Sequence, residues 1–281
     1  GNAGLSAVAE EFAKDYKDIT GFSAQVINGT KEDAKRGDFY LDLTAKDMGL
    51  DKEGYVMEIA DAVFVDAEQP VGAYYATRSI LQILKQADGS IPKGLVRDYP
   101  KYEVRGFSLD VGRKPFALDT LQEFAKNMSW YKMNSFQVHL SDNLIFMEDY
   151  STIEEAKEQT YAGFRLESGV LNSEGKSATS EDVYYTKDDF RNFIQDSRSI
   201  GVDIVPELDM PAHALPFTRA FPEFRTKRET GGSHKYLIDE LDLSNPQATE
   251  FAKSLWEDYF TGSEPVFDED TVIHIGTDEY H

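Results

Sequence analysis

The pattern of apolar and polar positions changes about a third of the way along the chain. Residues 1–100 hold four short runs rich in β-forming residues and separated by Gly, Asp and Lys: 23–27, 39–43, 54–59 and 62–65. Helical spacing follows over 70–87. This order predicts a small α+β domain over 1–100. Two prolines and mixed charges predict that 91–101 is a linker.

From residue 102 onward, β-rich runs alternate with helical patterns. The β-rich runs are 104–110, 135–142, 202–209 and 271–278. Apolar stripes between and after them, such as Phe190 with Phe193 and Phe251 with Leu255, indicate helices that each cover one face of a sheet. Strand–helix alternation predicts an α/β domain over 101–281 with parallel strands and crossover helices.

Each of these four runs ends in a carboxylate. The endings are Asp110, Asp142, Asp209 and the pair Asp278-Glu279, and Arg113, His139, His213 and His274 lie close to them in sequence. Parallel α/β folds carry their active sites at the C-terminal ends of the strands. The endings therefore predict one polar active site, although Asp also ends strands for purely local reasons.

The pair Asp278-Glu279 is the sharpest candidate for acid–base chemistry. Adjacent carboxylates repel, so one of them tends to have a raised pKa and can donate a proton beside a fixed anion. The alternative is an ordinary solvated acidic pair. The small residue Gly276 favours a site, because it leaves room for a ligand.

The composition argues against several classes of binding partner. The chain has 51 Asp and Glu against 29 Lys and Arg, a net charge of −22, which argues against binding nucleic acid or an anionic membrane surface. The absence of cysteine excludes disulfides and thiolate metal sites. No signal peptide is recognisable, which leaves both a removed signal and a cytoplasmic origin open.

A metal site is the main competing interpretation of the acidic cluster. Asp209 with His213, and His274 with Asp278, have a four-residue spacing. Pro211 interrupts the first pair, and four residues of a strand cover about 13 Å in the second. We therefore expect no metal and no cofactor, and we expect His139 to be a hydrogen-bonded core histidine.

At these residues the sequence resembles glycoside hydrolase family 20, the β-N-acetylhexosaminidases. The matching motifs are Arg-Gly-Phe-Ser-Leu-Asp-Val-Gly-Arg at 105–113, Val-His-Leu-Ser-Asp at 138–142, Pro-Glu-Leu-Asp-Met-Pro-Ala-His at 206–213 and His-Ile-Gly-Thr-Asp-Glu at 274–279. Residues 1–100 resemble the small domain that precedes the catalytic barrel in this family. The resemblance implies a partial (β/α)8 TIM barrel with about four of its eight strands.

The resemblance also implies a reaction and roles. Family members release terminal β-linked N-acetylhexosamine from glycans with retention, using the substrate's own acetamido oxygen as nucleophile. Glu279 would be the general acid and base, and Asp278 would orient the acetamido group. Arg113, Asp142 and His213 would bind substrate. Asp209 and His274 would hold these substrate-binding residues in position without contacting the substrate.

Three residues or segments depart from the family pattern. Asn143 stands where a second Asp is usual, Ala212 replaces a Gly, and Leu144-Ile145-Phe146 lacks the Gln-Gly-Trp-Arg-like continuation. The implied partner is a glycan or glycoconjugate, at an extracellular or cell-surface location. Alternatives are a lacto-N-biosidase of the same family, which has less use for Arg113, and a non-catalytic carbohydrate-binding module.

The length of the predicted barrel segment, residues 101–281, leads to a further expectation. Only about 180 residues follow the small domain, whereas a complete barrel takes about 250. We therefore expect a truncated protein that is inactive as it stands and that pairs with a copy of itself, rearranges its last strand or is only marginally stable. Its open strand edges would be exposed, together with apolar helix faces such as Phe251 and Leu255.

Overall fold

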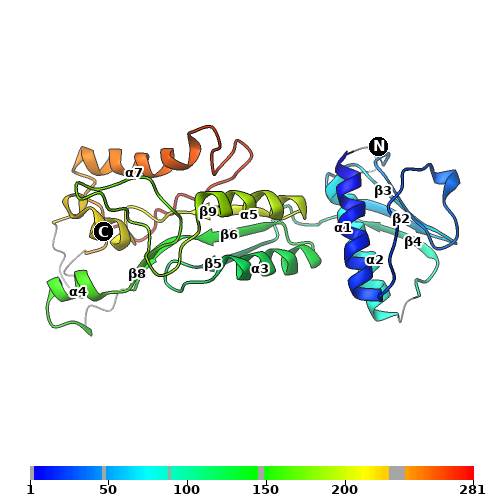
Figure 1. Ribbon diagram of the computed structural model, residues 1–281, viewed down its shortest axis with the longest axis horizontal. Coiled ribbons are helices and arrows are strands. Elements are labelled where there is room, and N and C mark those ends of the chain that lie inside the picture. The colour runs from blue at the N-terminus through cyan, green and yellow to red at the C-terminus, as the bar shows by residue number, and fades with distance from the viewer. Residues whose placement is uncertain (1–2, 46–48, 88–89, 145–148, 228–237) are drawn as a thin grey trace. The chain divides into compact units, whose positions relative to one another are not determined.

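Two sheets with different connectivity divide the chain into two units. In a computed structural model, residues 3–45, 49–87, 90–144, 149–227 and 238–281 are described. One unit comprises Gly1–Arg105 with Met128–Met133, and the other Gly106–Asn127 with Asn134–His281 (Figure 1). Ile145 and Phe146, noted above, lie outside the described residues.

The first unit is a four-stranded sheet with two helices. Strands β1 (Phe39–Asp42), β2 (Tyr55–Ile59), β3 (Val63–Ala67) and β4 (Gly94–Asp98) lie in the order β1-β3-β2-β4. Only the β1–β3 pair is parallel. Helices α1 (Ala3–Thr20) and α2 (Pro70–Gln86) pack together, and a short 3-10 turn, η1 (Lys31–Asp33), precedes β1.

The structure corrects two expectations for this unit. Residues 23–27 are not a strand: they pair with no strand among the described residues, and Ile27 is 75% exposed. The predicted linker 91–101 instead contains β4, which pairs antiparallel with β2. Its charges and flanking prolines are tolerated because β4 is an edge strand whose outer side faces no neighbour in the sheet.

The second unit is built on a parallel sheet. Strands β5 (Gly106–Asp110), β6 (Ser135–His139) and β9 (Asp203–Glu207) lie in the order β5-β6-β9, and Asp110, His139 and Glu207 are aligned across it. The main helices are α3 (Leu118–Trp130), α5 (Lys187–Ser199) and α7 (Pro246–Phe260). This is the predicted α/β fold with part of a barrel, and the described residues form no closed barrel.

The fourth predicted run, 271–278, joins this sheet at one position only. His274 makes a single parallel bridge with Glu207, and no strand is formed there. Between β6 and β9, β7 (Ser141–Asn143) pairs antiparallel with β8 (Ala162–Phe164), with α4 (Ile153–Gln159) between them in sequence. After β9 come α6 (Leu215–Ala220) and the 3-10 turn η3 (Pro222–Phe224).

The parallel sheet separates apolar from polar side chains by strand alternation. Phe136 of β6 contacts Phe124 of α3 and Phe193 of α5, with ring centroids 6.3 and 6.4 Å apart, so both helices cover one face. Gln137 and His139 point to the opposite face, because successive strand residues alternate. The face opposite α3 and α5 therefore carries the polar side chains that can take part in a reaction.

Helix α7 is packed, contrary to the expected exposure of its apolar face. Phe251 is 5% exposed and Leu255 is fully buried. The ring of Phe251 lies 4.4 Å from that of Phe221 and 5.0 Å from that of Phe224. The long connection after β9 supplies these aromatic partners, which the sequence pattern did not reveal.

Within the described part of the chain, no helix combines the length and apolar character that crossing a membrane requires.

Candidate active site

A polar cavity of about 330 Å³ opens at the C-terminal ends of the parallel strands. It is lined by Ser108, Asp110, Arg113, Gln137, His139, Asp142, Glu207, Asp209, His213, Asp278 and Glu279. Six of the seven predicted site residues are in this lining. The seventh, His274, reaches it indirectly, with Nδ1 2.8 Å from Oε1 of Glu207.

Arg113 is fixed in the cavity by both ends of its guanidinium. Its Nη1 donates to Asp110 at 3.0 Å and lies 2.7 Å from Oδ2 of Asp142, while Nε donates to the carbonyl of Asn143 at 3.0 Å. The side chain is still 37% exposed. It can therefore offer N–H groups to a ligand without first being ordered.

A chain of three side chains connects the buried Asp142 to the exposed Glu279. Nδ1 of His213 donates to Oδ1 of Asp142 at 3.1 Å. Nε2 of His213 lies 3.0 Å from Oε2 of Glu279 and 3.8 Å from Oδ2 of Asp278. The Nε2 contact lacks hydrogen-bond alignment, so this buried nitrogen has no hydrogen-bond partner.

Charge pairing sets the protonation of this chain. The hydrogen bond to Asp142 outweighs burial and raises the pKa of His213 to about 9. Burial alone would raise the pKa of Asp142, but the hydrogen bonds from His139 and His213 lower it to about 2. At neutral pH the Asp142 carboxylate therefore faces two protonated imidazoles.

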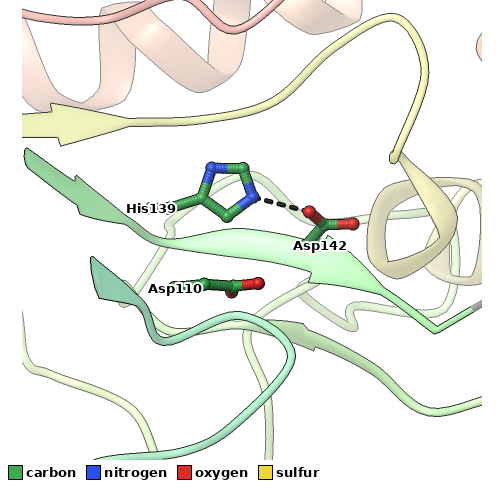
Figure 2. A group of neighbouring side chains, drawn as sticks. All are labelled: Asp110, His139 and Asp142. Atoms are coloured by element: carbon green, nitrogen blue, oxygen red, sulfur yellow. Dashed lines mark hydrogen bonds and ion pairs between the residues drawn. The ribbon is translucent and has the colours of Figure 1, made fainter. Parts of the chain in front are cut away.

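His139 extends the network towards β9, as part of a cluster with Asp110 and Asp142 (Figure 2). Its Nε2 lies 2.6 Å from Oδ2 of Asp142, and its Nδ1 lies 2.9 Å from Oε2 of Glu207. Burial opposes its charge, yet these two carboxylates raise the pKa of His139 to about 10. His139 is thus hydrogen-bonded, as expected, but it also lines the cavity.

Glu207 was not singled out from the sequence, although it ends β9. It accepts from Nε2 of Gln137 at 2.6 Å in addition to its histidine contacts. Burial raises its pKa, and these contacts reverse the effect and lower it. The available signal was strand alternation, which puts Gln137, His139 and Glu207 on the polar face.

Asp209 is the exception to this pattern of paired charges. It is 2% exposed, and its Oδ1 has no hydrogen-bond partner. Burial, assisted by the charge of Asp278 and opposed by His213, raises its pKa to about 7.

Gly276 lies against two carboxylates of the cavity lining. A Cβ there would lie 2.9 Å from Oε1 of Glu207 and 3.0 Å from Oδ1 of Asp209, and φ is +43°. Only glycine meets both demands readily.

Asp278 and Glu279 are the most accessible members of the site. Their side chains are 65% and 70% exposed, and Glu279 adopts a left-handed backbone conformation with φ of +54°. That turn allows two adjacent side chains to face one cavity, which a regular strand would prevent. The absence of a strand at 271–278 is consistent with this arrangement.

Asn143, one of the departures from the family pattern, has a structural role. Its Nδ2 donates to Oδ2 of Asp239 at 3.1 Å, and its Oδ1 accepts from the amide of Leu215 at 3.1 Å. An aspartate could not donate to Asp239. Asn143 thereby fixes the start of α6, close in sequence to His213.

Several donor groups are close enough to share a cation. Four triplets have one ligand atom each within 4.8 Å of one another: Asp110–His139–Asp142, His139–Glu207–Asp209, Asp142–Asp209–His213 and His213–Asp278–Glu279. Each contains His139 or His213, and both hold a proton at neutral pH. A metal ion would have to displace that proton before either imidazole could bind it.

The parallel sheet and its carboxylate-rich cavity define an α/β protein with a polar site at its strand ends. Residues 102–281 match the family model for the glycosyl hydrolase family 20 catalytic domain, and residues 1–99 match the model for domain 2 of the same family. The chain therefore belongs to glycosyl hydrolase family 20.

Curated relatives cover most of this chain. A lacto-N-biosidase from Bifidobacterium bifidum is 28% identical over 278 residues, 98% of this chain and 22% of the relative. An N,N'-diacetylchitobiase from Vibrio harveyi is 26% identical over 72% of this chain and 24% of the relative. The chain thus spans about a quarter of the length of these two relatives.

Solved structures share the fold. A chitobiase from Flavobacterium johnsoniae superposes with a TM-score of 0.73 at 23% identity, covering 99% of this chain and 40% of the other. An exo β-N-acetylglucosaminidase from Vibrio harveyi, in complex with N-acetylglucosamine, gives 0.67 at 19% identity, covering 92% and 40%.

Proposed function

We propose that the protein is a glycoside hydrolase that releases terminal β-linked N-acetylhexosamine from glycans. Family membership supports the reaction class, and the curated relatives are named for activities on such glycans. The observation that carries the proposal is the Asp142–His213–Glu279 chain, with Asp278 beside it. A binding module would not need a proton donor connected to a buried carboxylate.

In the proposed mechanism, Glu279 protonates the glycosidic oxygen while the acetamido carbonyl oxygen of the substrate attacks C1. The C1–oxygen bond to the leaving group breaks, and an oxazolinium ion forms. Asp278 accepts a hydrogen bond from the acetamido N–H and offsets the developing positive charge. Water then attacks C1 and gives a proton to Glu279, while the bond between C1 and the acetamido oxygen breaks and regenerates the acetamido group. The two displacements at C1 give retention.

The supporting residues act through charge. The charge of protonated His213 lies beside Glu279, with Nε2 3.0 Å from Oε2, and Asp142 keeps the imidazole oriented through Nδ1. This parallels other sites in which a buried carboxylate orients a catalytic histidine. Arg113 would donate to sugar hydroxyls from a guanidinium already fixed by Asp110 and Asp142.

The test is turnover of aryl glycosides by the full-length protein. We expect Glu279→Gln to abolish hydrolysis of substrates with poor leaving groups and to harm activated aryl substrates less, because these need less protonation. Asp278→Asn should harm both classes. Glu269→Gln, an exposed glutamate in an acidic turn, is the matched control and should behave as wild type. Equal hydrolysis of an aryl glycoside without the acetamido group would contradict the assisted mechanism.

A second candidate is a lacto-N-biosidase, which the Bifidobacterium bifidum relative favours. Such an enzyme releases a disaccharide, so the 3-hydroxyl of the reacting sugar is occupied and Arg113 has less to bind. Aryl N-acetylglucosaminide and aryl lacto-N-bioside should therefore be compared side by side. Turnover of the disaccharide substrate alone would select this candidate.

A further inference from the structure

Arg165 is a fully buried charged side chain of this unit, and it is not one of the predicted site residues. It follows β8, in a Gly163-Phe164-Arg165 sequence that has the glycine–aromatic–arginine pattern missing after Asn143. The excursion between β7 and β8 separates the two positions in the chain. Burying an arginine is costly unless its donors are all used, so its contacts are informative.

The guanidinium of Arg165 joins two loops. On one side, Nε donates to the carbonyl of Val111 at 2.8 Å and Nη2 donates to the carbonyl of Gly112 at 3.0 Å. On the other side, Nη1 donates to Oδ1 of Asp182 at 2.6 Å and to the carbonyl of Val183 at 3.0 Å. The two carbonyls on the first side immediately precede Arg113.

The same loop is pressed against the strand that carries Asp142. A Cβ on Gly112 would lie 2.6 Å from the amide nitrogen of Asp142, so the two backbones touch. The amides of Val111 and Gly112 both donate to the carbonyl of His139 at 3.1 Å. Residues 111–113 are therefore clamped between Arg165 and the end of β6.

We propose that Arg165 is a positioning residue that sets the location of Arg113 in the cavity. It is too buried to contact substrate itself. By holding the two carbonyls before Arg113, it keeps that guanidinium within reach of Asp110 and Asp142 when no ligand is bound. The functional meaning of this position rests on the proposed glycosidase activity, whereas the clamp itself does not.

The first test is hydrogen exchange on residues 1–281. Arg165→Lys keeps a charge beside Asp182 but cannot span both loops. We expect amide exchange in residues 111–113 to become about tenfold faster, equal to about 1.4 kcal/mol of lost protection. Unchanged exchange there would overturn the proposal whether or not the protein is a hydrolase.

Arg191 provides a matched control. It also donates to two consecutive carbonyls, those of Glu264 and Pro265, and pairs with Asp188, away from the cavity lining. Arg191→Lys should speed amide exchange at Glu264 and Val266, which flank Pro265, and leave 111–113 unchanged. If it loosened 111–113 to the same degree, a general loss of stability would explain the result and the proposal would fail.

The second test is kinetic and uses the full-length protein. Displacing Arg113 by about 1 Å can cost up to about 10²-fold. We expect Arg165→Lys to raise KM for an aryl N-acetylglucosaminide by tenfold or more with little change in kcat. A 3,4-dideoxy analogue should show no such rise. Equal losses on both substrates would overturn the positioning role. An inactive wild type would refute the proposed function and leave the exchange result to decide the clamp.

Discussion

Asp209 has a buried carboxyl group whose hydrogen bonding is incomplete. Its carboxyl is buried with one unpartnered oxygen, and its pKa is raised to about 7 in the folded state. A raised folded pKa means that the native state holds the proton more tightly than the unfolded chain, so ionisation at higher pH weakens the fold.

We therefore expect Asp209→Asn to stabilise the protein more at pH 8 than at pH 5. At pH 8 the wild type has a buried, unpaired carboxylate, and asparagine removes that charge at similar volume. The difference in the free energy of unfolding should grow with pH between about 4 and 8, and each pKa unit is worth about 1.4 kcal/mol. Urea unfolding at both pH values measures it, and an identical difference at the two would contradict the assignment.

The histidines predict a further loss of stability at still higher pH. The pKa values of His213 and His139 are raised to about 9 and about 10, above the ordinary 6.5. Their charge pairing stabilises the fold fully below pH 6.5 and is lost as pH rises through 9 and 10.

We therefore expect the free energy of unfolding to fall between pH 7 and 10. His139→Gln should flatten this fall, because the variant has lost one of the two groups responsible. Denaturant unfolding at intervals across the range gives the slope. A wild type equally stable at pH 7 and pH 10 would mean that these imidazoles are neutral in the native state.

At the scale of elements, the loop between β5 and α3 depends on the absence of a side chain at Gly112. A Cβ there would lie 2.6 Å from backbone, which cannot yield as a flexible side chain would. We expect Gly112→Ala to destabilise the protein by about 1–3 kcal/mol, in the range for overpacked sites. Gly94→Ala is the control, since a Cβ at Gly94 meets nothing within 4 Å. Comparable losses for both variants in urea unfolding would refute the close approach.

Elements with a strong local signal could be predicted from the sequence. The helix predicted from Phe190 and Phe193 forms as α5, where the amide of Asp189 donates to the hydroxyl of Thr186 at 3.1 Å. The stripe of Phe251 and Leu255 likewise forms α7. These signals are local, because capping and 3.6-residue spacing need no knowledge of the partner.

Elements that depend on a partner could not be predicted. β4 forms because the edge of β2 is available to pair with it. Residues 23–27 stay exposed because no described strand pairs with them. In the site, the acidic strand ends were visible in the sequence, but the pairing of His139 with two carboxylates and the clamp of Arg165 were not. The contact of His139 with Glu207 and the clamp of Arg165 both join segments that lie far apart in the chain.

At the scale of the whole molecule, the two edges of the parallel sheet are the feature relevant to self-association. Among the described residues, β5 pairs on one side only, and β9 meets just one bridge on its outer side. Next to that bridge, Val272 and Ile275 are 64% and 56% exposed. An exposed edge beside apolar side chains favours pairing with another chain.

We therefore expect residues 1–281 to self-associate, and the net charge of −22 to oppose this. Salt shortens the Debye length from about 30 Å at 0.01 M to about 8 Å at 0.15 M, so association should strengthen as salt is added. Light scattering across this range measures it. Replacing Val272 and Ile275 together by lysine should weaken association without loss of stability, because both side chains are exposed. Leu171→Lys, at an equally exposed position outside the edge, should not. A chain that stays monomeric at both salt concentrations would show that these edges are protected in solution.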